Sequence, residues 1–97
     1  MPTFVTLGNF TDQGIRAYED SPKRAQAFRD LVESMNGKVV DLYWTLGQYD
    51  LVAIIEAPDA ETAAAIAIKQ GSLGNVRTMT MPAFGKDAIQ RIIETTT

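Results

Sequence analysis

The sequence predicts an α+β fold of the ferredoxin-like kind, a four-stranded antiparallel sheet with two helices on one face. The first observation is size: 97 residues, 45% of them hydrophobic, suit one domain with one core over residues 1–97. The second is order, because segments with the period of a strand or of a helix follow one another as β-α-β-β-α-β, with a short helix at the C-terminus.

The first half of the pattern contains two strands and a helix. A strand is expected from Pro2 to Asn9, where β-branched and aromatic residues are frequent. An irregular connector follows, and Ser21-Pro22 then predicts a helix start, with a capping hydroxyl before a proline. The helix is expected to end at Asn36-Gly37. The second strand is expected from Lys38 to Leu46, where apolar residues alternate.

The second half repeats this arrangement after a turn at Gly47 to Asp50. Leu51 to Ala57 is almost entirely apolar and predicts a central strand. Asp59 is expected to cap a second, alanine-rich helix. Val76 to Pro82 predicts the fourth strand, and Phe84 to Glu94 the terminal helix.

Both faces of this sheet carry apolar residues. Leu51 and Ile55 belong to one alternating set of the third strand, and Val52 and Ile54 belong to the other. The two helices cover only one face, and a large apolar patch on the other usually marks an interaction surface. We therefore expect a homo-oligomer, a dimer or a multiple of dimers, with Leu51 and Ile55 in its interface.

Composition excludes several classes of function. The chain has no Cys and no His, which excludes thiolate and imidazole ligands. Asp and Glu could still bind a hard cation, but their spacing shows no calcium-loop pattern, so we expect no metal site and no cofactor. The net charge is −3, and there is no dense basic stripe, which argues against nucleic-acid binding. No apolar run has the length of a membrane span, and no signal peptide is recognisable. The expected location is the cytoplasm, with no contact to nucleic acid or membrane.

Five separated blocks of sequence carry a family resemblance: MPTFVTL, SPKR, GQYD, IEAPD and LGNVRTMT. In this order the chain resembles the GYD-domain family from Pro2 to about Ile93. The resemblance implies a ferredoxin-like domain that associates as a dimeric α+β barrel. That architecture is shared with antibiotic-biosynthesis monooxygenases, muconolactone isomerases and ligand-sensing domains of transcription regulators. The resemblance implies no established reaction.

Two groups of residues are the first candidates for a site. Tyr49 and Asp50 end the GQYD block, where a phenol and a carboxylate could bind a polar ligand or transfer a proton; the alternative is that they only stabilise the hairpin. Lys23 and Arg24 lie at a helix start, where an anion is favoured, although a salt bridge could equally occupy them.

Arg77 and Tyr18 complete the set of candidates. Arg77 lies within the fourth strand, where its charge needs solvent, an acid such as Glu56 or Asp41, or a ligand. Tyr18 is a further phenol for binding or proton transfer.

Three functions remain open at this point. The first is an oligomeric module that binds a small anionic molecule in a cleft between sheet and helices. The second is a cofactor-free enzyme of the monooxygenase or isomerase kind, with Tyr49, Asp50 or Tyr18 as proton-transfer groups. The third is a structural role through oligomerisation.

Overall fold

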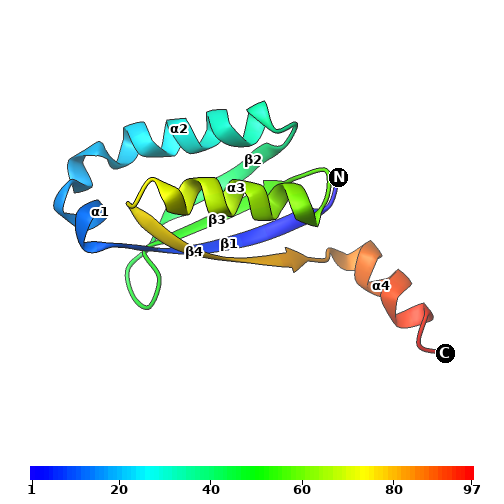
Figure 1. The fold of residues 1–97 in the computed structure, drawn as a ribbon. Helices are drawn as coiled ribbons and strands as arrows, with labels where there is room; N and C mark the ends of the chain where they lie inside the picture. The colour runs from blue at the N-terminus through cyan, green and yellow to red at the C-terminus, as the bar shows by residue number, and fades with distance from the viewer.

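The computed structural model describes all residues, 1–97, and contains four strands and four α-helices (Figure 1). A short 3-10 turn, Tyr18–Asp20, joins the first two helices. In chain order the elements are β1 (Thr3–Phe10), α1 (Asp12–Arg16), α2 (Ser21–Ser34), β2 (Lys38–Trp44), β3 (Leu51–Glu56), α3 (Ala60–Ser72), β4 (Val76–Ala83) and α4 (Lys86–Glu94).

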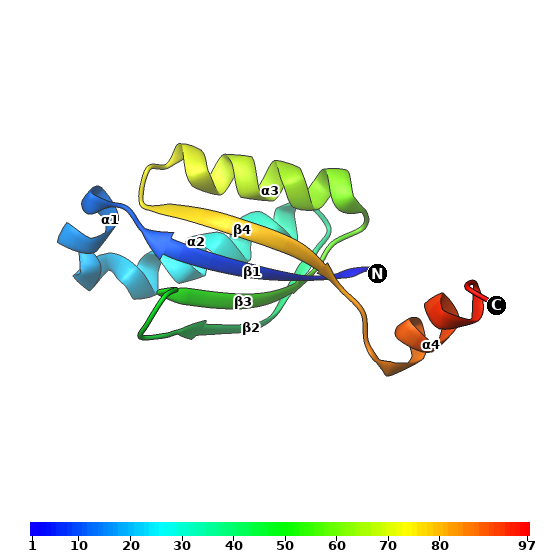
Figure 2. The ribbon, with the colours of Figure 1, turned by 90° about the horizontal axis from the view of Figure 1, so that it is seen from below.

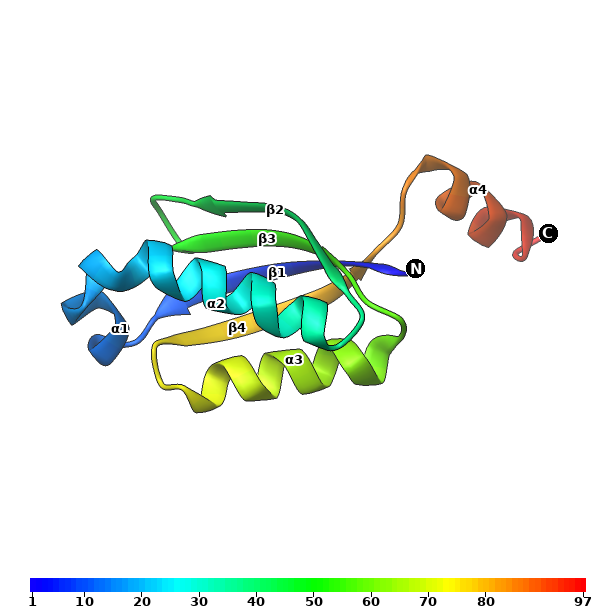
Figure 3. The same ribbon diagram turned by 90° about the horizontal axis from the view of Figure 1, so that it is seen from above.

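The sheet has the order β2-β3-β1-β4, and all of its neighbouring strands are antiparallel. Helices α2 and α3 lie side by side on the same face of this sheet (Figure 3). Seen from the other side, β1 passes in front of α2, and α3 runs alongside the edge strand β4 (Figure 2). The predicted ferredoxin-like fold is therefore confirmed. None of the four α-helices meets the length and hydropathy that a membrane-spanning helix requires.

The ends of the two main helices lie where the local signals predict them. Pro22 lies in the first turn of α2, and Asn36, just after the helix, has a positive φ of 65°. The predicted capping hydroxyl is wrong, because Ser21 is the first residue of the helix, Asp20 precedes it without a side-chain capping bond, and the Ser21 hydroxyl accepts a hydrogen bond from Arg24 instead.

Asp59 caps α3, because its carboxylate accepts a hydrogen bond of 2.7 Å from the Thr62 N–H. This helix extends to Ser72 and therefore includes Gly71. Gly74, which follows the helix, has a positive φ of 85°.

A hydrophobic core fills the space between the helices and one end of the sheet. Val32 of α2, Ile55 of β3 and Ile66 of α3 are almost completely buried, at 0%, 1% and 2% exposure. Each such side chain stabilises the fold by about 1.5–3 kcal/mol through burial. Phe4, Phe28, Val39, Ala53, Ala57 and Ala63 complete the cluster.

The other face of the sheet has no helix over it (Figure 2). Two rows of apolar residues cross it: Ile54 pairs with Val5, and Val52 with Leu7. Met81 and Met79 extend the two rows onto β4. We call Val5, Leu7, Val52, Ile54, Met79 and Met81 the open face.

The sequence analysis placed Leu51 and Ile55 on the face of the sheet that the helices leave open, and this prediction is wrong. Ile55 is 1% exposed within the core, and Leu51 lines the space under the helices. Successive residues of a strand point to opposite sides, so a shift by one position exchanges the two faces. Val52 and Ile54 are the β3 residues on the open face.

Helix α4 extends away from the rest of the molecule (Figures 1 and 2). Phe84, before its start, and Ile93, in its last turn, are 59% and 57% exposed. Ile89 and Ile92 are also exposed. The helix begins at Lys86, two residues later than the sequence predicts.

Candidate ligand-binding site

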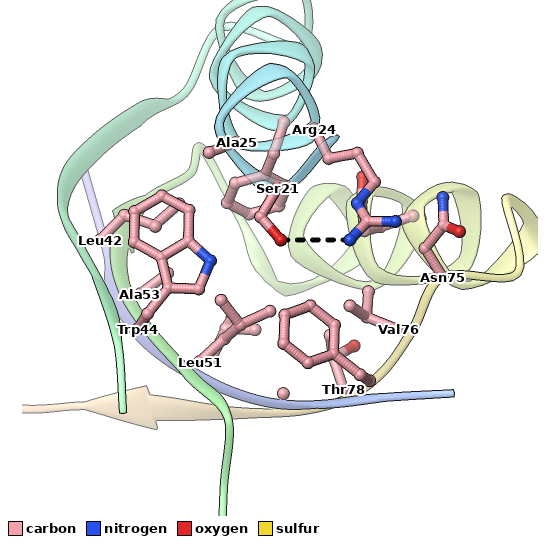
Figure 4. Close-up of a pocket in the computed structure, with 15 residues that line it drawn as sticks. Ser21, Arg24, Ala25, Leu42, Trp44, Leu51, Ala53, Asn75, Val76 and Thr78 are labelled. Carbon is pink, nitrogen blue, oxygen red and sulfur yellow. Dashed lines mark hydrogen bonds between the residues drawn. The ribbon is translucent and has the colours of Figure 1, made fainter. Parts of the chain in front are cut away.

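A pocket lies between the sheet and the two helices, where α2 begins and α3 ends (Figure 4). It has an interior volume of about 60 Å³ and residues from all four strands in its lining. This is the cleft between sheet and helices that the first hypothesis requires.

Side-chain size along the two central strands explains the hollow. On the side under the helices, Phe4 pairs with Ile55, Thr6 with Ala53, and Gly8 with Leu51. Large side chains at one end thus give way to Ala53, Thr6 and Gly8 toward the other end. Protein interiors are normally close-packed, so a run of small residues leaves space that the helices do not fill.

Arg24, in the first turns of α2, is the only ionisable residue in the lining. One of its terminal nitrogens donates hydrogen bonds to the carbonyl oxygen of Gly14, at 3.0 Å, and to the Ser21 hydroxyl, at 3.2 Å (Figure 4). Its guanidinium carbon lies 5.7 Å from the centre of the Phe10 ring, within the range of a cation–π interaction. The guanidinium is therefore fixed in place, and no carboxylate neutralises it within the pocket.

Gln70 brings a second polar group to the pocket from the last turn of α3. The residue is only 9% exposed, yet its side-chain amide takes part in no hydrogen bond of the protein. No completely buried side-chain nitrogen or oxygen atom lacks a partner, so the amide atoms of Gln70 keep some exposed surface, and the residue lines the pocket. An amide offers two donors and one acceptor, and leaving them unpaired is costly. Water or a ligand in the pocket is the partner that remains.

Most of the remaining lining is apolar. Phe10, Phe28, Leu51 and Val76 surround the interior, and Trp44, 48% exposed, stands at its side on β2 (Figure 4). Such a lining, with a few polar groups that point inward, is typical of sites for small organic molecules.

Tyr49 and Asp50 lie outside this pocket, in the turn between β2 and β3. The Asp50 carboxylate accepts a hydrogen bond of 2.9 Å from the Phe10 N–H, and the Tyr49 carbonyl accepts one of 2.6 Å from the Thr45 hydroxyl. The backbone of Asp50 also bonds Gly8 and Thr45. These contacts hold the turn against the end of β1, while a ligand role for either side chain stays a prediction.

The other predicted residues are also dispersed. Lys23 and Tyr18 are exposed and do not line the pocket. Arg77 is exposed on the edge strand β4, and its guanidinium reaches toward Gly71 of α3. The expected acid partners do not lie near it, because Glu56 pairs with Thr3 at the opposite end of the sheet. Of the six candidates, Arg24 alone lines the pocket.

Gln70 and Phe10 are among the lining residues that the sequence analysis did not identify. Gln70 is a polar residue in an alanine-rich helix, where such a residue usually faces solvent. Its spacing was a local signal, because it follows Ile66 by four residues and so shares the buried face of α3. A second signal was available on two strands that are expected to be neighbours: Thr6 pairs with Ala53, and Gly8 is the next residue on the same side of β1.

Comparisons with known proteins agree with this architecture. The GYD domain family matches residues 4–93. A protein of Thermus thermophilus, described as "Glutamine synthetase and cystathionine beta-lyase binding protein", is 39% identical over 85 residues, which are 87% of this chain and 90% of that protein.

Solved structures show the same fold. The crystal structure of TTHA0845 from Thermus thermophilus has a TM-score of 0.56 at 28% identity and covers 88% of this chain and 95% of its own. The leucine response regulatory protein LrpA of Mycobacterium tuberculosis has a TM-score of 0.65 at 16% identity. That match covers 88% of this chain, which spans about half, 51%, of LrpA.

The family match extends over nearly the whole described fold, from β1 to the last turn of α4. It includes the G-x-Y-D residues Gly47 to Asp50, which form the turn between β2 and β3. The chain therefore belongs to the GYD-domain family.

Proposed function

We propose that this protein is an oligomeric module that binds a small organic molecule in the pocket under α2 and α3. The observation that carries the proposal is the pair formed by Arg24, a cation with no acidic partner in the lining, and Gln70, a residue only 9% exposed whose side-chain amide makes no hydrogen bond within the chain. A ligand that reaches both groups would complete the polar contacts that the protein leaves open.

The same lining argues for binding rather than proton transfer. Tyr49, Asp50 and Tyr18, the groups that a cofactor-free monooxygenase or isomerase would use, do not line the pocket. The one ionisable residue that does is Arg24, and a guanidinium offers five N–H donors but no acceptor for a proton. The enzyme hypothesis therefore has no base at this site.

A screen of small organic acids, alcohols and amides by thermal shift tests the proposal. We expect at least one compound to stabilise the wild type and the control Val52→Leu, which changes the other side of β3. Ala53→Leu, which fills the pocket from within the same strand, should lose this response. The proposal is wrong if no compound stabilises the wild type, or if Ala53→Leu responds equally.

Self-association is the second part of the proposal. The open face and the apolar residues of α4 lack cover within one chain, and two copies that pack sheet against sheet would bury the open face. Val52→Asp and Ile54→Asp should convert the oligomer to monomers in native mass spectrometry. Ala64→Asp, on the exposed side of α3, is the matched control and should leave the assembly intact. A monomeric wild type would contradict this part.

A second candidate function rests on the 39% identical Thermus thermophilus relative, whose description names two enzymes that it binds. This protein would then bind glutamine synthetase or cystathionine beta-lyase of its own source organism. Surface plasmon resonance with the two purified enzymes tests this candidate directly. Saturable binding supports it, and the absence of binding at micromolar concentrations contradicts it.

A further inference from the structure

We propose that the pocket selects a small carboxylate with an apolar tail and no ammonium group, such as a branched 2-oxo acid or a short branched fatty acid, over the corresponding amino acid. This inference rests on the proposed function and names the ligand class of the same pocket. It follows from which charges the lining contains and which it lacks.

The carboxylate is assigned to Arg24. A guanidinium has five N–H donors, and the two hydrogen bonds to Gly14 and Ser21 leave three of them free. Both bonds come from one terminal nitrogen, so the other terminal nitrogen has both of its donors available. Hydrogen bonds between guanidinium and carboxylate are stronger than those between neutral groups.

The rejection of an ammonium group follows from the absence of acidic side chains. No Asp or Glu lines the pocket, and Arg24 would repel a second cation there. Asp50, near the end of β1, is not part of the lining and already accepts a hydrogen bond from Phe10. The Thr6 hydroxyl is likewise engaged, with Thr80 at 3.0 Å. An amino acid would therefore enter with no negatively charged partner for its ammonium group and with the Arg24 cation in the same pocket.

Gln70 distinguishes the ligand further. Its amide donors can contact a carbonyl or the second carboxylate oxygen, which gives a 2-oxo acid one more partner than a plain fatty acid. The ligand's tail would lie among Phe10, Phe28 and Val76, over the small residues of the central strands. The interior volume of about 60 Å³ limits that tail to a few carbons.

Isothermal titration calorimetry with four probes that share one carbon skeleton tests the inference. The probes are 4-methyl-2-oxopentanoate, 4-methylpentanoate, L-leucine and 4-methylpentan-1-ol. We expect 4-methyl-2-oxopentanoate and 4-methylpentanoate to bind. Leucine and the alcohol should bind roughly 10-fold or more weakly, because leucine carries an ammonium group that has no acidic partner in the pocket, and the alcohol has no carboxylate for Arg24. Fluorescence of Trp44, the single tryptophan, beside the pocket, gives an independent readout.

Three variants locate the effect. Arg24→Gln should weaken the binding of both acids by roughly 10-fold or more and leave the affinity for the alcohol unchanged. Lys23→Gln is the matched control, because it removes a neighbouring charge outside the pocket. Arg24→Lys retains the charge and substitutes for Arg24→Gln if the latter unfolds, with the melting temperature of each variant measured alongside. It should still prefer the acids to the alcohol.

The outcomes separate the inference from the proposed function. If leucine binds as tightly as the acids, or the alcohol does, the ligand class is wrong while small-molecule binding stands. If no probe binds but other compounds of the screen do, the ligand class is again wrong. If neither the probes nor the screen give binding, both proposals are wrong.

Discussion

The two ends of the space between helices and sheet are built from the same elements but packed differently. At one end Phe4, Ile55 and Val32 fill the interior completely. At the other end, two to four residues along the same strands, Ala53 and Gly8 leave a pocket with a fixed cation beside it. Stability therefore comes mainly from the filled end, and the hollow end is available for binding.

Under the proposed function, one core of a 97-residue chain would provide both stability and a binding site. The antiparallel pairing of β1 with β3 extends without interruption from the filled end to the hollow end. The backbone of the hollow end is thus held by the same ladder that the core stabilises, and its side chains need not fill the space. Substitutions at matched positions of the two ends should therefore differ in cost.

The largest expected effect is at the filled end. Ile55→Ala should lower the free energy of unfolding by about 2–5 kcal/mol, because it leaves a cavity in a closed core. Leu51→Ala, on the same strand beside the pocket, should cost clearly less, about 1–2 kcal/mol, because part of its surface is already open. Urea unfolding measures both. Equal costs would contradict the proposed difference in packing.

The next effect concerns the support of the hollow end. A side chain at the buried Gly14 would overlap the carbonyl oxygen of Asn75. Gly14→Ala should therefore cost about 1–3 kcal/mol and displace the carbonyl that holds Arg24. Gly85→Ala, where a Cβ meets nothing within 4 Å, is the control and should change stability by about 0.5 kcal/mol or less in urea unfolding. A Gly14→Ala variant as stable as this control would count against the close packing of α1 on Asn75.

Enlarging one alanine at each end sharpens the comparison. Ala63→Leu, in the core cluster, should destabilise by about 1–3 kcal/mol through overpacking. Ala53→Leu should cost less than about 1 kcal/mol, because its side chain can enter the pocket. Thermal unfolding of the two variants side by side checks this order, and the reverse order would show that the pocket does not accept the added atoms.

The smallest effect is at the start of α3, where hydrogen bonds from the Thr62 side chain and backbone N–H lower the pKa of Asp59 below 3.8. A lowered folded-state pKa adds stability that is present above the unfolded pKa and is lost as the pH falls through the folded value. Asp59→Asn can keep a cap but not the charge. The stability advantage of the wild type over Asp59→Asn should therefore shrink below pH 3.8, as urea unfolding from pH 6 to pH 2.5 would show. A constant difference over this range would contradict the assignment.

Much of the fold could be predicted from the sequence because local signals agree with the tertiary structure. Ser21-Pro22 marks the start of α2, Asp59 that of α3, and the strands lie within a few residues of their predicted ranges. The assignment of strand faces was less secure. β3 is apolar at almost every position, so alternation could not show whether Leu51 or Val52 points to the helices.

The site could be predicted only in part, because a pocket forms where the side chains of several elements are together too small to fill the space between them. Arg24 was identified because a basic residue at a helix start is a local anomaly. Gln70 was missed because a polar side chain on a helix usually faces solvent, although it lies on the same helix face as the buried Ile66. Tyr49 and Asp50 were predicted as site residues because a phenol and a carboxylate can bind a ligand or transfer a proton. The hydrogen bonds in which they take part stabilise the turn between β2 and β3.

The most direct test is a titration with 4-methylpentanoate followed by two-dimensional ¹⁵N–¹H NMR of the assigned wild-type protein. We predict that signals shift at the hollow end, for Gly14, Arg24, Gln70 and the Trp44 indole, and stay in place for Val32 and Ile66. Shifts confined to the open face, or no shifts at millimolar ligand, would contradict the account.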